Sequence, residues 1–129
     1  MGERILVVDD EPSVLEIFRR VLSRDGHRVH LCLSPAEALG EFARADFDLL
    51  VVDKNLPGFN GFDLLATLRK VDPELPAILM TASPEPLPVG TARVQGYLPK
   101  PFKSLKQIGD TVRRVIELSE LWRGRRRVA

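Results

Sequence analysis

The sequence lacks several features that mark particular classes of protein. Its 129 residues hold a single cysteine, Cys32, so no disulfide can form within the chain and no cysteine pair has metal-ligand spacing. We therefore expect a reducing, cytoplasmic location. The apolar run near the N-terminus is too short for a signal peptide or a transmembrane helix, so we expect no membrane association. The formal net charge of +1 gives no overall field that would favour specific binding to nucleic acid.

Apolar residues make up 44% of the chain, which is enough for the core of one folded domain. Short runs rich in β-branched residues predict strands at 4–8, 28–32, 48–52 and 76–80, with a weaker one at 96–98. The first, third and fourth of these runs are apolar on consecutive positions, as in parallel strands that are covered on both faces. The sequence therefore predicts a buried parallel sheet.

Segments with the apolar spacing of a helix lie between and after these strands, at 14–22, 38–43, 64–71 and 105–116. Before the second segment, Ser34 and Pro35 are typical of a helix cap followed by proline at the first helical position. The repeated order of strand, helix and strand predicts right-handed crossovers and a parallel sheet with helices on both faces. The predicted fold class is α/β.

One helix is missing from this alternation, between the fourth and fifth strands. Pro84, Pro86 and Pro88 stand at alternate positions there, and each keeps the residue before it away from helical dihedral angles. We expect a proline-rich loop at 83–90, with at most a turn or two of helix at 91–95. A fourth helix would then be shortened or replaced by this loop.

Polar residues follow the predicted strands at their carboxyl ends, and in an open parallel sheet these ends share one edge, where ligands bind. They are Asp9, Asp10 and Glu11 after the first strand, Asp53 after the third, Thr81 after the fourth and Lys100 after the fifth. Carboxylates that are brought together repel one another, so such a cluster usually holds a cation. Oxygen ligands without histidine or cysteine favour a hard ion, Mg²⁺ rather than zinc.

A carboxylate can also attack a phosphoryl group and form an acyl phosphate. This transfer requires that the charge on the phosphoryl oxygens is offset and that the attacking oxygen is held in line. The acids with Mg²⁺, the ammonium group of Lys100 and the hydroxyl group of Thr81 would together meet these requirements.

Four motifs in order resemble the receiver domain of two-component response regulators, over residues 5–118. They are VVDDEP at 7–12, VVDKNLPG at 51–58, MTA at 80–82 and GYLPKPF at 96–102. The resemblance implies a flavodoxin-like, doubly wound sheet of five parallel strands in the order 2-1-3-4-5. It also implies a receiver domain at 1–122, followed by a basic, disordered tail at 123–129.

The resemblance assigns a role to each residue of the cluster. It implies that Asp53 is the phosphoacceptor and that Asp10, Asp53 and the backbone carbonyl group of Asn55 bind Mg²⁺ directly, with Asp9 assisting through water. Thr81 would move onto the phosphoryl group, Tyr97 would swing inward behind it, and Lys100 would pair with the phosphate. The peptide bond between Lys100 and Pro101 is expected to be cis.

A receiver domain implies a function in signalling and particular partners. It would take a phosphoryl group from a sensor histidine kinase or a phosphotransfer protein and pass the signal to a downstream protein, without being an enzyme in the usual sense. Leu118, Leu121 and Trp122 extend the apolar stripe of the last helix. They would form a partner or homodimer surface, pack back on their own domain, or lead into an output domain.

Three other functions fit parts of the sequence. The chain could be a receiver-like interaction module that signals without phosphorylation through the proline-rich segment. Its arginine-rich tail could bind DNA, although no helix-turn-helix follows. It could be a phosphatase with an aspartate nucleophile, but such enzymes usually have a second aspartate where this chain has Asn55.

Overall fold

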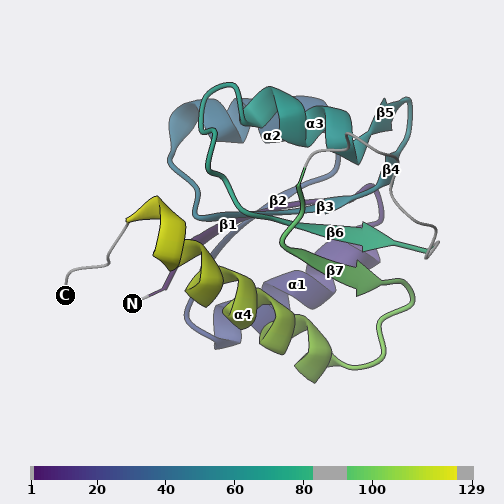
Figure 1. Ribbon diagram of the computed structural model, residues 1–129. Coiled ribbons are helices and arrows are strands. Elements are labelled where there is room, and N and C mark those ends of the chain that lie inside the picture. The colour runs from purple at the N-terminus through teal and green to yellow at the C-terminus, as the bar shows by residue number, and fades with distance from the viewer. Residues whose placement is uncertain (1, 83–92, 125–129) are drawn as a thin grey trace.

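A parallel sheet of five strands forms the centre of the molecule in the computed structural model, which describes residues 2–82 and 93–124 (Figure 1). The strands lie in the order β2-β1-β3-β6-β7, and all pairs are parallel. The predicted order is therefore confirmed. The bounds are Arg4–Val8 for β1, Arg28–Cys32 for β2, Leu49–Asp53 for β3, Ala77–Thr81 for β6 and Gly96–Pro99 for β7.

Four helices cover the two faces of this sheet in the described residues. Helices α1 and α4 lie on one face, and α2 and α3 lie on the other (Figure 1). Their bounds are Pro12–Arg24 for α1, Pro35–Arg44 for α2, Gly61–Leu68 for α3 and Leu105–Arg123 for α4. As predicted, Ser34 caps α2, because its hydroxyl oxygen accepts a hydrogen bond from the backbone N–H of Glu37 at 3.2 Å.

Successive side chains of a strand point to opposite faces, so the apolar runs of β1 and β3 fill two cores at once. Ile5 and Val51 pack in the core under α1 and α4, whereas Leu6 and Val52 pack in the core under α2 and α3. This burial on both faces explains the consecutive apolar residues in the sequence. It also holds the carboxyl ends of the strands in a fixed register, on which the site depends.

Two features of the fold differ from the sequence prediction or lie beyond it. A short hairpin of β4 (Asn55–Leu56) and β5 (Phe59–Asn60) follows β3 directly and was not predicted. Strands β3 and β6 begin and end one residue later than expected.

The predicted proline-rich loop at 83–90 lies outside the described residues. Of the segment at 91–95, the described residues 93–95 are not helical.

The end of α4 packs back on its own domain. The indole N–H of Trp122 donates to the backbone oxygen of Glu74 at 3.2 Å. Arg123 pairs with Asp72 at 2.8 Å, and the side chain of Arg123 is only 3% exposed. Leu121 is 81% exposed and contributes little to this packing. Of the roles that the sequence left open for the end of the helix, packing on the domain is therefore observed for Trp122. Arg123, which was expected to begin the disordered tail, is instead the last residue of α4 and pairs with the domain.

We expect Arg123→Met to lower the free energy of unfolding by about 2 kcal/mol. The substitution would leave Asp72, which is only 18% exposed, without its 2.8 Å partner. Urea denaturation should measure the loss. Arg113→Met is the matched control, because Arg113 pairs with Asp110 at 2.6 Å in the same helix but is 62% exposed, and it should change stability by less than about 0.5 kcal/mol. Equal losses in the two variants would contradict the prediction.

Candidate acidic site at the carboxyl edge of the sheet

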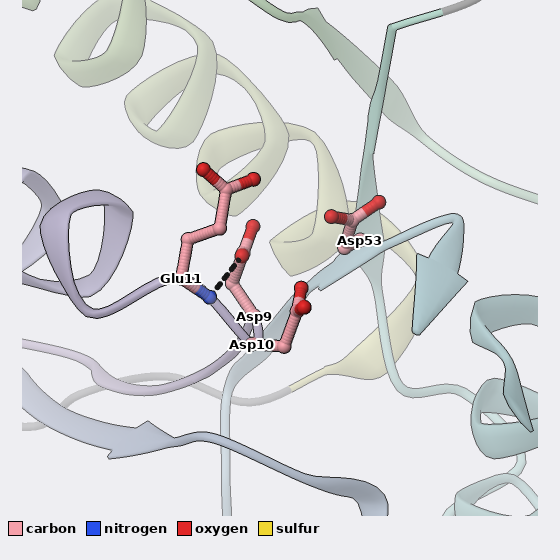
Figure 2. A group of neighbouring side chains, drawn as sticks. All are labelled: Asp9, Asp10, Glu11 and Asp53. Carbon is pink, nitrogen blue, oxygen red and sulfur yellow. Dashed lines mark hydrogen bonds between the residues drawn. The ribbon is translucent and has the colours of Figure 1, made fainter. Parts of the chain in front are cut away.

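The acidic residues that follow β1 and β3 meet at the carboxyl edge of the sheet. Val8 of β1 pairs in register with Val52 of β3, so the residues that follow both strands emerge side by side. Asp9 and Asp53 are buried, whereas Asp10 and Glu11 are exposed. Figure 2 shows the four carboxylates gathered around one space. One carboxylate oxygen from each lies within 4.8 Å of the others.

Local hydrogen bonds orient the two buried carboxylates. Asp9 Oδ1 accepts a hydrogen bond from the backbone N–H of Glu11 at 2.9 Å, which is drawn as a dashed line in Figure 2. Asp53 Oδ1 accepts the corresponding bond from the backbone N–H of Asn55 at 3.0 Å. Each aspartate therefore holds the backbone two residues further along, as in an Asx-turn. The remaining oxygen of each carboxylate, Oδ2, is left to face the common space.

Lys100 joins these two remaining oxygens. Its Nζ donates to Asp9 Oδ2 at 2.6 Å and to Asp53 Oδ2 at 2.8 Å, and the lysine side chain is 14% exposed. Burial raises the pKa of Asp9, and the hydrogen bond from Lys100 opposes that rise only in part. For Lys100, burial alone would lower the pKa, but the hydrogen bonds with Asp53 and Asp9 outweigh it and raise the pKa above its ordinary value. The lysine is therefore a permanent cation in the site.

The structure brings together most of the residues that the sequence singled out. Asp9, Asp10, Asp53 and Lys100 form the cluster, and Asn55 adjoins it through its backbone N–H. Thr81 is at the end of β6, where its carbonyl oxygen accepts from the backbone N–H of Lys100 at 2.8 Å. Tyr97 is the exception, because its side chain on β7 is 44% exposed and is not part of the cluster.

Two details of the site bear on the sequence prediction. The peptide bond between Lys100 and Pro101 is cis, as expected. Glu11 belongs to the cluster, although the prediction did not include it among the metal ligands. Its place directly after Asp9 and Asp10 was the only signal in the sequence, and a glutamate at a strand end is more often solvated than bound.

The hairpin after Asp53 turns the chain back onto the backbone of this aspartate. Gly58 provides the turn with φ of 66°, a conformation that favours glycine. Asn60 then caps α3, since its side-chain oxygen accepts from the N–H of Phe62 at 2.7 Å. The first residue of α3, Gly61, donates to the carbonyl oxygen of Lys54 at 2.9 Å. A Cβ atom on Gly61 would lie only 2.3 Å from the backbone oxygen of Asp53.

We expect Gly61→Ala to destabilise the fold by about 2 kcal/mol and to weaken Mg²⁺ binding. The added methyl group would meet backbone atoms of Asp53 and Lys54, which cannot rotate away as a side chain could. Urea denaturation and calorimetric titration with Mg²⁺ should measure both effects. Gly40→Ala is the control in α2, because a Cβ atom there meets nothing within 4 Å. A stable Gly61→Ala chain with unchanged Mg²⁺ affinity would show that the backbone of Asp53 does not lie close enough to position 61 to affect stability or Mg²⁺ binding.

The arrangement can bind a hard cation at oxygen ligands and can present the Asp53 carboxylate beside a fixed positive charge. The carboxylates suit Mg²⁺ chemically, because they are hard, anionic and close together, and exposed Asp10 keeps its carboxylate open to solvent.

No helix among the described residues, 2–82 and 93–124, is long and apolar enough to cross a membrane.

The fold and the site are those of a small α/β signalling domain. The chain matches the family model of the response regulator receiver domain over residues 5–113, and it belongs to this family. Residues 5–113 include the central sheet, except Arg4 at the start of β1, and the whole acidic cluster. The family that the sequence motifs suggested is therefore confirmed.

Curated relatives are longer than this chain. The DNA-binding transcriptional regulator NtrC of Rhizobium meliloti is 36% identical over 111 residues, which are 84% of this chain and 23% of NtrC. Response regulator MprA of Mycobacterium bovis is 39% identical over 105 residues, which are 79% of this chain and 46% of MprA. The chain thus spans less than half the length of these relatives.

Solved structures of receivers have the same fold. A CheY-like receiver domain protein from Methanospirillum hungatei superposes with a TM-score of 0.82 at 23% identity, covering 94% of this chain and 98% of that one. The response regulator TrrA of Thermotoga maritima, solved in complex with Mg²⁺ and BeF, superposes with a TM-score of 0.76 at 28% identity. That match covers 88% of this chain and 98% of TrrA.

Proposed function

We propose that this receiver domain accepts a phosphoryl group on Asp53 in a Mg²⁺-dependent reaction and relays the signal by a change of conformation. The donor would be a phosphorylated sensor histidine kinase or phosphotransfer protein. The observation that carries the proposal is the position of Asp53, buried at the strand end with Oδ1 held by Asn55 and Oδ2 beside Lys100. Such a carboxylate is oriented and has a cation ready to offset new negative charge.

The proposed transfer uses the carboxylate of Asp53 as a nucleophile. A bond forms between a carboxylate oxygen and phosphorus while the bond from phosphorus to the donor imidazole breaks; the imidazole, already protonated on its other ring nitrogen, leaves as a neutral ring. The hydrogen bond from Asn55 fixes the orientation of the carboxylate, since it occupies Oδ1 at 3.0 Å. The proposed nucleophile is a carboxylate, so the step has no proton for a general base to remove.

Lys100 and Thr81 would stabilise the product. Lys100 now contacts Asp53 Oδ2 at 2.8 Å, so a short movement of its flexible side chain would bring the ammonium group onto a phosphoryl oxygen. Thr81 ends the neighbouring strand and would donate its hydroxyl proton to the phosphoryl group. Tyr97, now 44% exposed on β7, would turn inward as Thr81 moves and so change the surface that a partner meets.

Asp10, Asp53 and the backbone carbonyl group of Asn55 would hold Mg²⁺, with Asp9 assisting through water. When bound, the ion would neutralise charge on the phosphoryl oxygens. Support comes from the four clustered carboxylates and from the Mg²⁺ and BeF complex of TrrA. Without the ion, the cluster has four carboxylates against the single ammonium group of Lys100 within the described residues. That imbalance favours cation binding.

The rest of the function is proposed from the family. The receiver domain, expected from the sequence at 1–122, would extend to Arg123, the last residue of α4, and the basic tail would follow it. The chain would act in the cytoplasm as a signalling domain whose only catalysis is its own phosphorylation and dephosphorylation. Its output would be contact with a downstream protein, or with a second copy of the chain.

Beryllofluoride, which imitates a phosphoryl group on a carboxylate, tests the proposal. We expect the chain to bind it only with Mg²⁺ present, in a ¹⁹F NMR titration, and the backbone signals of Thr81 and Tyr97 to shift on binding. A chain that binds no beryllofluoride, and takes up no phosphate from a phosphorylated kinase, would instead be an interaction module that signals without phosphorylation.

A further inference from the structure

Glu11 occupies the N-cap position of α1 but does not act as a cap. Within the described residues, its side chain makes no hydrogen bond to the first turn of the helix. Serine, threonine, aspartate and asparagine are the residues that usually cap a helix at this position. The next residue, Pro12, has no backbone N–H, so the first turn has one donor fewer to satisfy. The carboxylate of Glu11 is therefore free of a role in the helix.

This carboxylate faces Lys100 instead. Glu11 Oε1 lies 3.4 Å from Lys100 Nζ, and the Glu11 side chain is 58% exposed. An ammonium group has three N–H donors, and Lys100 directs them at Asp9, Asp53 and Glu11. The contacts with Asp9 and Asp53, at 2.6 and 2.8 Å, are already short, whereas the contact with Glu11 can still shorten. Glu11 is thus the partner toward which Lys100 can move.

Lys100 and a divalent cation would compete for the same buried carboxylates. A cation held by Asp10 and Asp53 repels the ammonium group that now contacts Asp53 Oδ2 at 2.8 Å. Lys100 must then give up part of its contact with Asp53 and Asp9. Of the carboxylates that Lys100 contacts, only that of Glu11 is exposed, so it marks the solvent-facing side of the cluster, which we call the mouth of the site.

We propose that Glu11 is a positioning residue for Lys100, which it holds at the mouth of the site when a divalent cation binds. The inference rests on the proposed function, because the lysine is held there for the phosphoryl group that follows. Glu11 thereby gives Lys100 an alternative partner and makes Mg²⁺ binding easier. Its action passes through Lys100 and does not require that Glu11 touch the ion.

A double-mutant cycle with Mg²⁺ alone as the probe tests this inference by calorimetric titration. We expect Glu11→Gln to weaken Mg²⁺ binding about fivefold, because this is the change in affinity that the loss of one exposed ion pair produces. In a Lys100→Met background the same substitution should weaken binding by about twofold or less, because the lysine on which Glu11 acts is gone. If Glu11 bound the ion directly, the loss would be as large without Lys100 as with it, and the inference would be wrong.

Two controls complete the cycle. Glu16→Gln removes the same charge from an exposed position of α1, where Glu16 pairs with Arg19, and should leave Mg²⁺ affinity unchanged. Should Lys100→Met not fold without Mg²⁺, Lys100→Gln serves as the second neutral background. Independently of the cycle, the wild-type chain should bind beryllofluoride at saturating Mg²⁺ if Asp53 accepts a phosphoryl group. If the wild-type chain bound no beryllofluoride, the proposed function would be wrong. The role of Glu11 would still be decided by the Mg²⁺ affinities of the four chains in the cycle.

Discussion

Asp53→Asn is expected to take up no detectable phosphate from a phosphorylated histidine kinase, from acetyl phosphate or from any other donor. The amide of asparagine has nearly the same shape as the carboxylate but is not a nucleophile toward phosphorus at neutral pH. It can still accept the hydrogen bond from Asn55 at Oδ1, so the local fold should remain. Retention of radioactive phosphate by the protein, measured after removal of the donor, gives the result.

Asp10→Asn is the matched control for this loss. It removes the same charge from the cluster, but Asp10 is exposed and its substitution leaves the Asp53 carboxylate and its contact with Lys100 in place. We expect this variant to need far more Mg²⁺ than the wild type and yet to be phosphorylated when the ion is saturating. Phosphate on the Asp53→Asn chain, or a complete loss in Asp10→Asn at saturating Mg²⁺, would move the acceptor role away from Asp53.

The sequence predicts which of these side chains lie together, because their positions depend on strand ends. Residues that follow the buried runs of β1 and β3 must emerge at one edge of a parallel sheet, so Asp9 and Asp53 could be placed together without a structure. Lys100 could be placed there for the same reason, since it follows the last strand. The sequence therefore predicts which residues lie together, and the parallel register of the strands brings their side chains close to one another.

Other features depend on contacts that leave no periodic signal. Strands β4 and β5 have only two residues each, too few for an alternating pattern, so the hairpin after Asp53 was not predicted. The need for glycine at position 61 arises from the backbone oxygen of Asp53, eight positions earlier in the chain, and is visible only once the hairpin has folded. The role of Glu11 depends likewise on a lysine 89 positions away.

Lys100→Met should lower the free energy of unfolding by about 3 kcal/mol in the absence of Mg²⁺. Asp9, which is fully buried, and Asp53 would then face each other without the cation that now lies 2.6 and 2.8 Å from them. Removing one partner from buried ion pairs commonly costs about 3–5 kcal/mol, and the 14% exposure of Lys100 places this case at the lower end. Urea denaturation in the presence of a chelator should measure the loss.

Mg²⁺ should restore most of this stability, because an ion that binds only the folded chain stabilises it more as its affinity rises, and the lysine no longer competes for the carboxylates. We therefore expect Mg²⁺ to stabilise Lys100→Met more than it stabilises the wild type. Lys106→Met is the control, since Lys106 pairs with Asp110 at 2.7 Å but is 83% exposed, and its stability should change little with or without the ion.

If Lys100→Met were as stable as the wild type in chelator, the carboxylates would not depend on the lysine for their charge balance. If Mg²⁺ failed to stabilise it, they would not form a cation site, so the two measurements test the charge balance and the metal site separately.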